Sequence, residues 1–182
     1  MRTTVTDGDG GTSANNDVTI TIAGVNDDAD IGGDLTGGTI EDNGTGATGS
    51  LTITDVDTNE STFTAQTANT TTYGTFSVNT SGNWTYDLDS SKTAVQALAN
   101  GATMTDIITI ASVDGTQKQI TITITGVNGV ATITGISTGA ATEDDATQIT
   151  GSLAITDEDT GEAVFVAQTN AAGSYGAFNL ET

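Results

Sequence analysis

The sequence contains no histidine, no cysteine and no proline, and its only basic residues are Arg2, Lys92 and Lys118, against 24 acidic residues. The formal net charge of -21 disfavours nucleic acid as a partner, because neutralising phosphates requires lysine and arginine. An anionic membrane surface is disfavoured for the same reason. Without histidine or cysteine, the chain can build neither a catalytic triad nor a zinc or copper site with the usual ligands. Oxygen atoms are the metal ligands that remain.

Long apolar runs are also missing. No stretch approaches the roughly 20 apolar residues that cross a bilayer, and the N-terminus lacks the apolar region of a signal peptide. We therefore expect any secretion signal to lie outside this chain and no membrane insertion. The lack of cysteine excludes a disulfide framework, so stability outside the cell would have to come from another source, such as bound metal. The abundant residues are threonine, glycine, alanine, asparagine, aspartate and isoleucine, a composition typical of all-β proteins.

One stretch occurs twice. Residues 51–60 read LTITDVDTNE and residues 153–162 read LAITDEDTGE, at an offset of 102 residues. The offset holds without a gap from Gly24 and Gly126 to the C-terminus, and just over half of the aligned positions are identical. The chain is therefore predicted to be a tandem array. Residues 1–27 are expected to end one repeat, 28–128 to form a complete repeat, and 129–182 to form the first half of another.

A period of about 100 residues suits a β-sandwich that folds around its own core. In the complete repeat we expect seven short antiparallel strands, near residues 29–31, 50–54, 62–66, 74–79, 84–88, 107–112 and 119–125. A hairpin is predicted at 76–86, and the run Asp89-Ser90-Ser91 is expected to cap a helical turn after it. A strand is also expected at 18–22, which repeats the alternation of 120–124. The residues predicted to face inward are Leu51, Ile53, Phe63, Phe76, Trp84, Leu88, Leu98, Ile110, Ile120, Ile122 and Ile124.

Several motifs of the complete repeat occur together and in order. They are NWTY at 83–86, VQAL at 95–98, MTD at 104–106, VDG at 113–115 and ITITITGVN at 120–128. In these the chain resembles the VCBS repeat, a cadherin-like module of long bacterial surface adhesins, often RTX-type and secreted by the type I route. The resemblance implies tandem immunoglobulin-like sandwiches, calcium at their junctions, and an extracellular stalk that supports attachment and biofilm formation.

The acidic residues themselves point to a cation. Each repeated strand runs into Asp-x-Asp-x-x-Glu with no basic residue nearby, and like charges a few ångströms apart repel by roughly 1 to 4 kcal/mol per pair. Calcium takes six to eight oxygen ligands, commonly carboxylates. The resemblance places such ligands at the base of one module, in the linker and at the top of the next. The candidate ligands are Asp7, Asp9, Asn26, Asp27, Asp28, Glu41, Asp42, Asp55, Asp57, Glu60, Asp114, Asn128, Glu143, Asp144, Asp157, Asp159 and Glu162.

Within this set we expect Asp7 and Asp9 at the base of the preceding repeat, and Glu41 beside Asp55 and Asp57 at the top of the middle one. Asp114 is expected at the base of the middle repeat. The linker after it has lost both aspartates of the first linker, so the second junction is predicted to bind calcium more weakly and to be looser. The alternative reading is that these acids serve turn chemistry and solubility.

Other site chemistries fit less well. An EF-hand loop needs glycine at its sixth position, where this chain has Glu60. The DGDGG run at 7–11 is not a calcium β-roll, because no second turn follows at nine-residue spacing. Paired carboxylates can hydrolyse glycosides, but such sites need stacking aromatics, which make up only 4% of this chain. We therefore expect no enzyme.

Three functions remain open. The first is a structural stalk whose partners are neighbouring repeats of the same protein. The second is a filament subunit, in which the last strands in 1–27 of one chain complete the first strands in 129–182 of the next. The third is a repeat that binds glycan or protein directly, for which Tyr73 and Tyr175 are the modest candidates.

Overall fold

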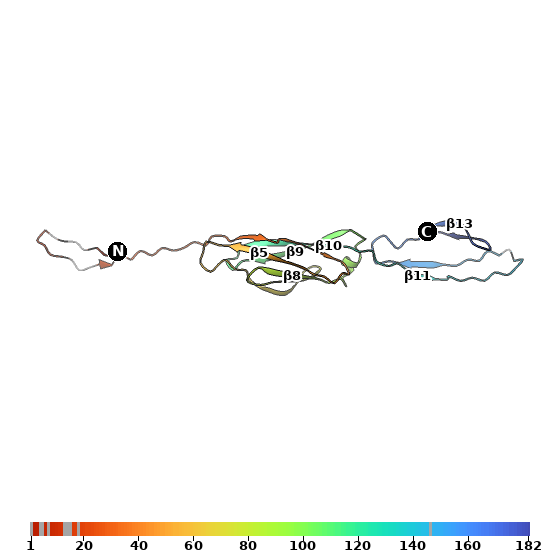
Figure 1. Cartoon of the computed structure of the whole chain (residues 1–182), viewed down its shortest axis with the longest axis horizontal. Coiled ribbons are helices and arrows are strands. Elements are labelled where there is room, and N and C mark those ends of the chain that lie inside the picture. Colours follow the sequence, from red (N-terminus) through yellow and green to blue (C-terminus); the bar gives the residue numbers. More distant parts are fainter. Residues whose placement is uncertain (1, 4–5, 7, 13–15, 18, 146) are drawn as a thin grey trace.

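The computed structural model describes residues 2–3, 6, 8–12, 16–17, 19–145 and 147–182. Its regular structure is nearly all β, which confirms the expected fold class. Three parts follow one another along the long axis of the molecule in Figure 1, namely a small hairpin, a central sandwich and a third part. In the described residues, each sheet takes its strands from a single part.

The central sandwich has a five-stranded sheet and a three-stranded sheet. The first has the order β3-β5-β8-β7-β6 and comprises β3 (Asp30–Gly33), β5 (Ala47–Thr54), β6 (Gln66–Thr70), β7 (Gly74–Val78) and β8 (Asn83–Leu88). The second has the order β4-β10-β9 and comprises β4 (Thr36–Ile40), β9 (Thr103–Ala111) and β10 (Gln117–Thr125). All pairs in the sandwich are antiparallel except β4 with β10.

The core lies between the two sheets, because alternate residues of each strand point to the same face. Trp84 is 1% exposed; its Nε1–H donates to the Asp34 carbonyl at 3.0 Å, and its ring centroid lies 6.0 Å from that of Phe76. The predicted inward residues are confirmed as core, with Ile53, Leu88 and Leu98 only partly buried. The buried ones are Leu51, Phe63, Phe76, Trp84, Ile110, Ile120, Ile122 and Ile124.

The predicted 76–86 hairpin is confirmed as β7 and β8, with Gly82 at φ 85° in its turn. Several expectations were wrong. The sandwich has eight strands and not the seven expected, because β4 was not among them, and β4 pairs with β10 in parallel and not antiparallel. The strand expected at 62–66 is reduced to one bridge between Phe63 and Ser112, and β6 begins only at Gln66. The helix α1 (Thr93–Gln96) follows Lys92 and has no side-chain cap. Asp89 does not cap it, because Asp89 Oδ1 accepts hydrogen bonds from the amide and the hydroxyl of Ser91.

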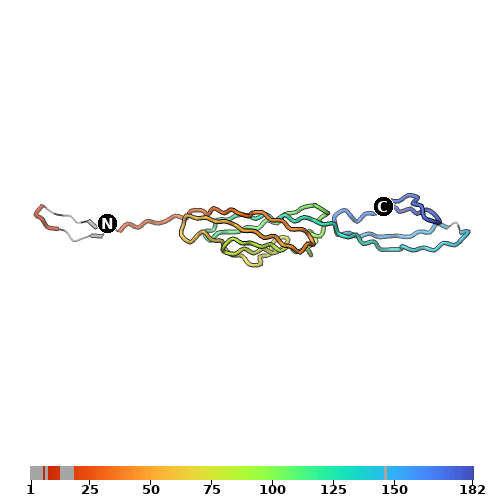
Figure 2. Tube along the Cα trace, in the orientation of Figure 1, coloured from red at the N-terminus to blue at the C-terminus, as the bar shows by residue number. Residues whose placement is uncertain are grey.

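The first part contains β1 (Arg2–Thr3) paired with β2 (Asn16–Asp17). The strand expected at 18–22 is not formed over its described residues, and residues 19–29 run extended without a sheet partner, as the trace in Figure 2 shows. The reason is that the matching β10 lies between two neighbouring strands, whereas nothing described flanks residues 19–22. Alternating apolar residues therefore did not suffice to make a strand here.

The third part repeats the pairing of the sandwich at the offset of 102. It contains β11 (Thr132–Gly135) paired with β12 (Leu153–Thr156), as β3 is with β5, and β13 (Gln168–Ala172) paired with β14 (Ala177–Leu180), as β6 is with β7. Both β6 and β13 carry an irregularity three residues wide at equivalent positions. The sequence repeat is thus also a structural repeat.

Among the described residues, no helix is long and apolar enough to span a bilayer.

Candidate metal centres at the two ends of the sandwich

The end of the sandwich where residues 26–29 enter carries a carboxylate cluster. Asp55, Asp57 and Glu60, here called the entrance cluster, follow the end of β5 and place one oxygen each within 4.8 Å of one another. The loop that holds them is tied by the Asp57 amide, which donates to Asp55 Oδ1 at 2.7 Å, and by the Asp55 amide, which donates to Ser61 Oγ at 3.0 Å. Local hydrogen bonds therefore gather three like charges.

Two oxygens of the entrance cluster are left without a hydrogen-bond donor. Asp55 Oδ2 and Glu60 Oε2 are both buried and unpartnered, which is costly for a charged group. Burial and the charges of Asp57, Asp55 and Asp114 raise the pKa of Glu60. A cation at this point would supply the missing partner for both oxygens.

The linker and a distant hairpin also reach the entrance cluster. The Asp27 amide donates to Asp57 Oδ2 at 2.8 Å, and the Ala29 amide donates to Asp114 Oδ2 at 3.1 Å. Asp114 also accepts from the Ser112 and Thr116 hydroxyls, and these bonds hold the pKa of Asp114 well below its usual range. The entrance end is thus built from the linker, the loop after β5 and the β9–β10 turn.

The position of Asp114 corrects the sequence analysis, which placed it at the base of the middle repeat. β10 leads into the next linker, so the turn that precedes it lies a full strand of nine residues away, at the opposite end. The same reasoning applies to the first part. Asp9 lies in the turn between β1 and β2, and not at the junction as expected. Figure 1 shows the tip of this hairpin at the far left, away from the sandwich. Asp7 lies outside the described residues.

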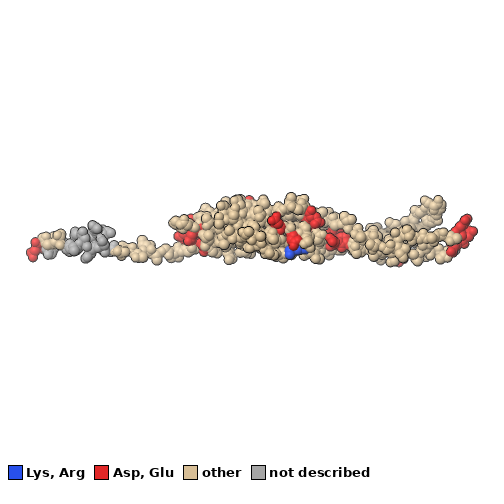
Figure 3. Space-filling view, turned by 90° about the horizontal axis from the view of Figure 1, so that it is seen from below, with Lys and Arg blue, Asp and Glu red and all other residues tan. Residues whose placement is uncertain are grey.

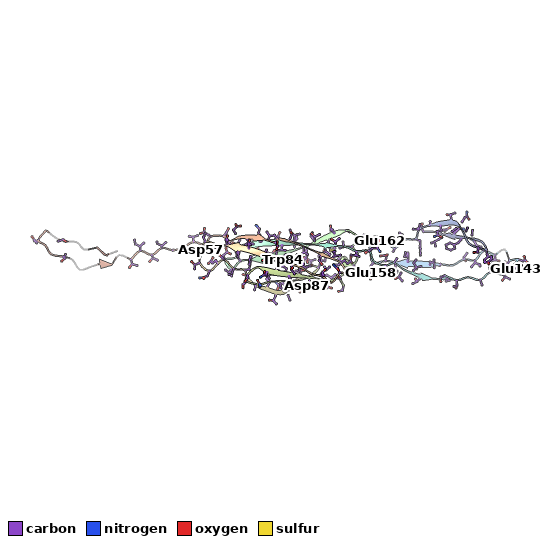
Figure 4. All side chains as sticks on the ribbon, in the orientation of Figure 1. Asp57, Trp84, Asp87, Glu143, Glu158 and Glu162 are labelled. Atoms are coloured by element: carbon purple, nitrogen blue, oxygen red, sulfur yellow. The ribbon has the colours of Figure 1, made fainter. Side chains whose placement is uncertain are left out.

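Glu41 lies at the exit end, where residues 125–128 leave the sandwich. Its amide donates to the Thr125 carbonyl at 2.9 Å, and the Val127 amide donates to Glu41 Oε2 at 3.1 Å. The expectation that Glu41 joins Asp55 and Asp57 was wrong, because it follows β4, which runs parallel to β10 and ends beside it. Figure 4 shows the separation, with Asp57 at one end of the sandwich and Glu158 and Glu162 beyond the other.

Carboxylates of the third part meet Glu41 at this exit end. Burial raises the pKa of Glu41, although the Val127 hydrogen bond lowers it, and the charges of Asp42, Asp159 and Glu158 raise it further. Glu41 and Asp159 are each 3% exposed. Glu158 is a residue that sequence reasoning missed, since its counterpart in the middle repeat is Val56.

The hydrogen bonds of the second junction copy those of the first. The Gly129 amide donates to Asp159 Oδ2 at 2.8 Å, and the Asp159 amide donates to Asp157 Oδ1 at 2.9 Å. These match the bonds from Asp27 to Asp57 and from Asp57 to Asp55 in the first junction. The second junction adds a bond between modules, because the Thr160 amide donates to the Ala97 carbonyl at 3.3 Å.

The other acidic candidates lie in three places. Asp42 accepts from Gln96 Nε2 at 3.0 Å near the exit end, and the Glu162 amide donates to the Asp159 carbonyl at 3.3 Å. Asp28 is exposed in the first linker, whereas Glu143 and Asp144 are exposed at the far tip of the third part. The structure therefore does not bring Glu143 and Asp144 to the junction, just as it does not bring Glu41 to the entrance end.

Charge is distributed along the molecule in keeping with these clusters. In the view of Figure 3, acidic side chains gather at the left end of the sandwich, over its right half and at both extremities of the molecule. Of the two tyrosines considered as ligand contacts, Tyr175 is fully exposed, while Tyr73 is partly buried and donates its amide to Asp106. The entrance cluster has the composition and the unpaired oxygens that a hard metal ion requires.

Comparison with known proteins bears on the whole architecture. A family model described as a bacterial cadherin-like domain matches residues 26–126, which is more than half of the chain. No curated protein matches. This family has a structural and adhesion fold and is not a known enzyme family, and it indicates an extracellular module. The match agrees with the resemblance found in the sequence. The chain therefore belongs to the bacterial cadherin-like family.

Proposed function

We propose that this chain is an extender of a bacterial cell-surface adhesin, in which calcium at the junctions stiffens a row of sandwiches that supports attachment and biofilm formation. The proposal is supported by the repeated modules, which follow one another along one axis, and by the family. Partners are then neighbouring modules of the same protein. No step of this function requires catalysis.

The entrance cluster is the observation that carries the proposal. It combines three carboxylates with two buried, unpartnered oxygens and a direct hydrogen bond from linker residue Asp27 to Asp57. A site that only kept the protein soluble would leave its carboxylates in water. Oxygens buried at a linker instead couple cation binding to the position of the linker.

The residues of the cluster have separate roles in this proposal. Asp55 and Glu60 would offer the buried oxygens, while Asp57 would offer one oxygen and hold the Asp27 amide with the other. Bound calcium supplies positive charge that neutralises the mutual repulsion of these carboxylates. Without calcium, repulsion among these carboxylates opposes their close approach, and the linker gains conformational freedom.

Thermal unfolding in calcium and then in chelator tests this proposal. Calcium should raise the unfolding midpoint over the range of roughly 10⁻⁴ to 10⁻³ M typical of extracellular modules. Asp57→Asn should lose most of that rise. Asp87→Asn is the matched control, because Asp87 is exposed on β8 and lies apart from Asp57 (Figure 4). A midpoint that ignores calcium would remove the metal from the proposal, and small-angle X-ray scattering with and without calcium measures the stiffening.

A second candidate function is a self-assembling filament subunit. It is favoured by residues whose equivalents in the sandwich are buried. Ile122 and Ile124 are 0% exposed, whereas their counterparts Ile20 and Ile22 are 79% and 88% exposed. In the third part, Phe178 is 51% exposed, against 0% for Phe76. Strand addition from a second copy would cover such residues.

Size-exclusion chromatography over a range of protein concentrations separates the two candidates. A filament subunit elutes as larger species at higher concentration, and an added peptide of residues 16–28 should cap it. A chain that stays monomeric at every concentration tested supports the extender alone.

A further inference from the structure

The second linker contains an asparagine whose side chain folds over the next peptide. Asn128 is exposed, and its side-chain amide donates to the carbonyl of Gly129. The Gly129 amide in turn donates to Asp159 Oδ2 at 2.8 Å. Three groups that can react with one another are therefore held together, namely a side-chain amide, a backbone N–H and a carboxylate.

This arrangement suits an intramolecular reaction. The Gly129 nitrogen can attack Cγ of Asn128, because glycine has no Cβ to obstruct the close approach of its backbone. The carboxylate of Asp159 touches the N–H that must be lost and can accept its proton, as a positioned general base does. Holding the reacting groups in place lowers the entropic part of the barrier.

The first linker provides a natural comparison. The Asn26 side-chain amide donates to the Asp27 carbonyl at 3.1 Å, and the Asp27 amide donates to Asp57 Oδ2 at 2.8 Å. The two linkers thus share the same hydrogen bonds at the offset of 102. They differ in the attacking residue, which carries a side chain in the first linker and none in the second.

Two other asparagines precede glycine in this sequence. Asn43 donates its side-chain amide to Thr45 Oγ1 at 2.9 Å. The amide after Asn100 belongs to Gly101 and donates to the backbone carbonyl of Gly126 at 3.0 Å. Both are exposed, and in the part of the chain that the structure describes neither is followed by an amide that donates to a carboxylate, as the Gly129 amide does.

We propose that Asn128 is a site of spontaneous deamidation, with Gly129 as the attacking residue and Asp159 as the proton acceptor. The bond from the Gly129 nitrogen to Asn128 Cγ forms, the Cγ–Nδ2 bond breaks, and ammonia leaves with the proton taken from the Gly129 nitrogen. Water then opens the succinimide to aspartate or isoaspartate. No oxidant, reductant or further reactant is required.

The product changes the charge of the joint. The second linker carries no carboxylate, whereas the first carries Asp27 and Asp28. Deamidation adds one carboxylate at position 128, next to Asp157 and Asp159, and does so irreversibly. The second joint would thereby come to resemble the first as the protein ages.

Peptide mapping by mass spectrometry of the full chain, incubated in chelator at neutral pH, tests the proposal. Chelator keeps the result independent of the proposed calcium binding. We expect Asn128 to gain the mass of an NH₂-to-OH exchange, in both aspartyl and isoaspartyl forms, before Asn43 and Asn100 do. Asn128 reacting no faster than these two internal controls would overturn the proposal.

Two variants assign the roles. Gly129→Ala leaves room for the new methyl, since its Cβ would lie 3.6 Å from the nearest carboxylate oxygens, and it should suppress the reaction at Asn128 alone. Asp159→Asn should slow it at least tenfold, given the roughly 10²- to 10⁴-fold effect of a positioned general base. An unchanged or faster rate in Asp159→Asn would show that Asp159 is not the proton acceptor. Circular dichroism checks that both variants keep the fold.

Discussion

The backbone amide of Val127 donates a hydrogen bond to Glu41 Oε2 at 3.1 Å, although 86 residues separate the two. This bond ties the residue that follows β4 to the linker that follows β10. It fixes the start of the second linker against the sandwich through a carboxylate that is nearly buried. The direction in which the chain leaves the module therefore depends on one acidic side chain.

Glu41→Gln is expected to have opposite effects with and without calcium. In chelator, the amide keeps an acceptor for Val127 and removes a charge that is repelled by Asp42, Asp159 and Glu158, so the unfolding midpoint should rise. In calcium, it should fall, because a ligand charge is lost. Glu143→Gln is the control, since Glu143 is the exposed counterpart of Glu41 at offset 102. A midpoint shifted equally in both buffers would contradict a role in cation binding.

The strand β4 shows where prediction from the sequence fails. Its sequence, TGGTI, contains two glycines and a single apolar residue, which is typical of a turn and not of a strand. The structure explains one of the glycines. A Cβ on Gly37 would lie 2.8 Å from the Trp84 ring and 2.9 Å from the Ile122 side chain. The requirement comes from Trp84 on the facing sheet and from Ile122 on the neighbouring strand β10, and the local pattern cannot reveal either.

The end of the sandwich at which each acidic residue lies was also not predictable from the sequence. The repeat and the alternation in β7, β8 and β10 were readable from the sequence, because each depends on local spacing. The assignment of an acid to one end or the other depends instead on strand direction. Because β4 was not predicted, Glu41 was assigned to the wrong end of the sandwich. Asp114 was also assigned to the wrong end, because it lies in the turn before β10, which is at the entrance end.

Trp84→Ala should destabilise the sandwich by about 3 to 5 kcal/mol, the usual cost of removing a buried aromatic side chain. The ring is 1% exposed, and its loss would also leave the Asp34 carbonyl without the indole donor. Urea unfolding followed by circular dichroism measures the change. Tyr175→Ala is the control, because that ring is fully exposed and its removal should cost less than about 0.5 kcal/mol. Similar losses in both variants would argue against Trp84 as the core anchor.

Tyr86 and Asp106 should be energetically coupled. The Tyr86 hydroxyl donates to Asp106 Oδ2 at 3.0 Å, inside the sandwich. Burial raises the pKa of Asp106, but hydrogen bonds from Thr71, Tyr73, Tyr86 and Thr72 lower it more. A double-mutant cycle with Tyr86→Phe and Asp106→Asn should give a coupling energy of about 0.5 to 3 kcal/mol. Additive effects of the two substitutions would show that the hydrogen bond does not contribute to stability.

In chelator, stability should pass through a maximum at mildly acidic pH. The pKa values of Glu41 and Glu60 are raised above 4.5 by burial and by neighbouring carboxylates, so their charged forms oppose folding, and protonating them on acidification stabilises the fold. The pKa values of Asp106 and Asp114 are lowered from 3.8. Their contribution is present above that value and is lost as the pH falls through their folded pKa.

Thermal unfolding between pH 7 and pH 3 measures this profile. The midpoint should rise from neutral pH toward about 4.5 and fall below about 3.8. Saturating calcium should remove the rise, because the cation already neutralises the glutamates. A steady decline from neutral pH in chelator would contradict the repulsion inferred at the two ends.

The linker aspartates should control how tightly each joint holds calcium, and exchanging them tests this directly. Asp27→Gly with Asp28→Val gives the first linker the residues of the second, and Gly129→Asp with Val130→Asp does the reverse. The first pair should weaken calcium binding, because each lost carboxylate is a lost ligand charge. It should also loosen the chain, because glycine at position 27 adds backbone freedom, although its amide can still donate to Asp57 as the Gly129 amide does to Asp159. The second pair should strengthen binding at the exit end, where room beside Asp157 and Asp159 accommodates a side chain at position 129.

Glu143→Gln with Asp144→Asn is the control. It removes as much charge as the first exchange, but at the far tip, and should leave calcium binding unchanged. Isothermal titration and small-angle scattering follow affinity and extension. If neither exchange changes them, the linker charges do not set the joints, and the second joint depends instead on Glu41 and on the contact between Thr160 and Ala97.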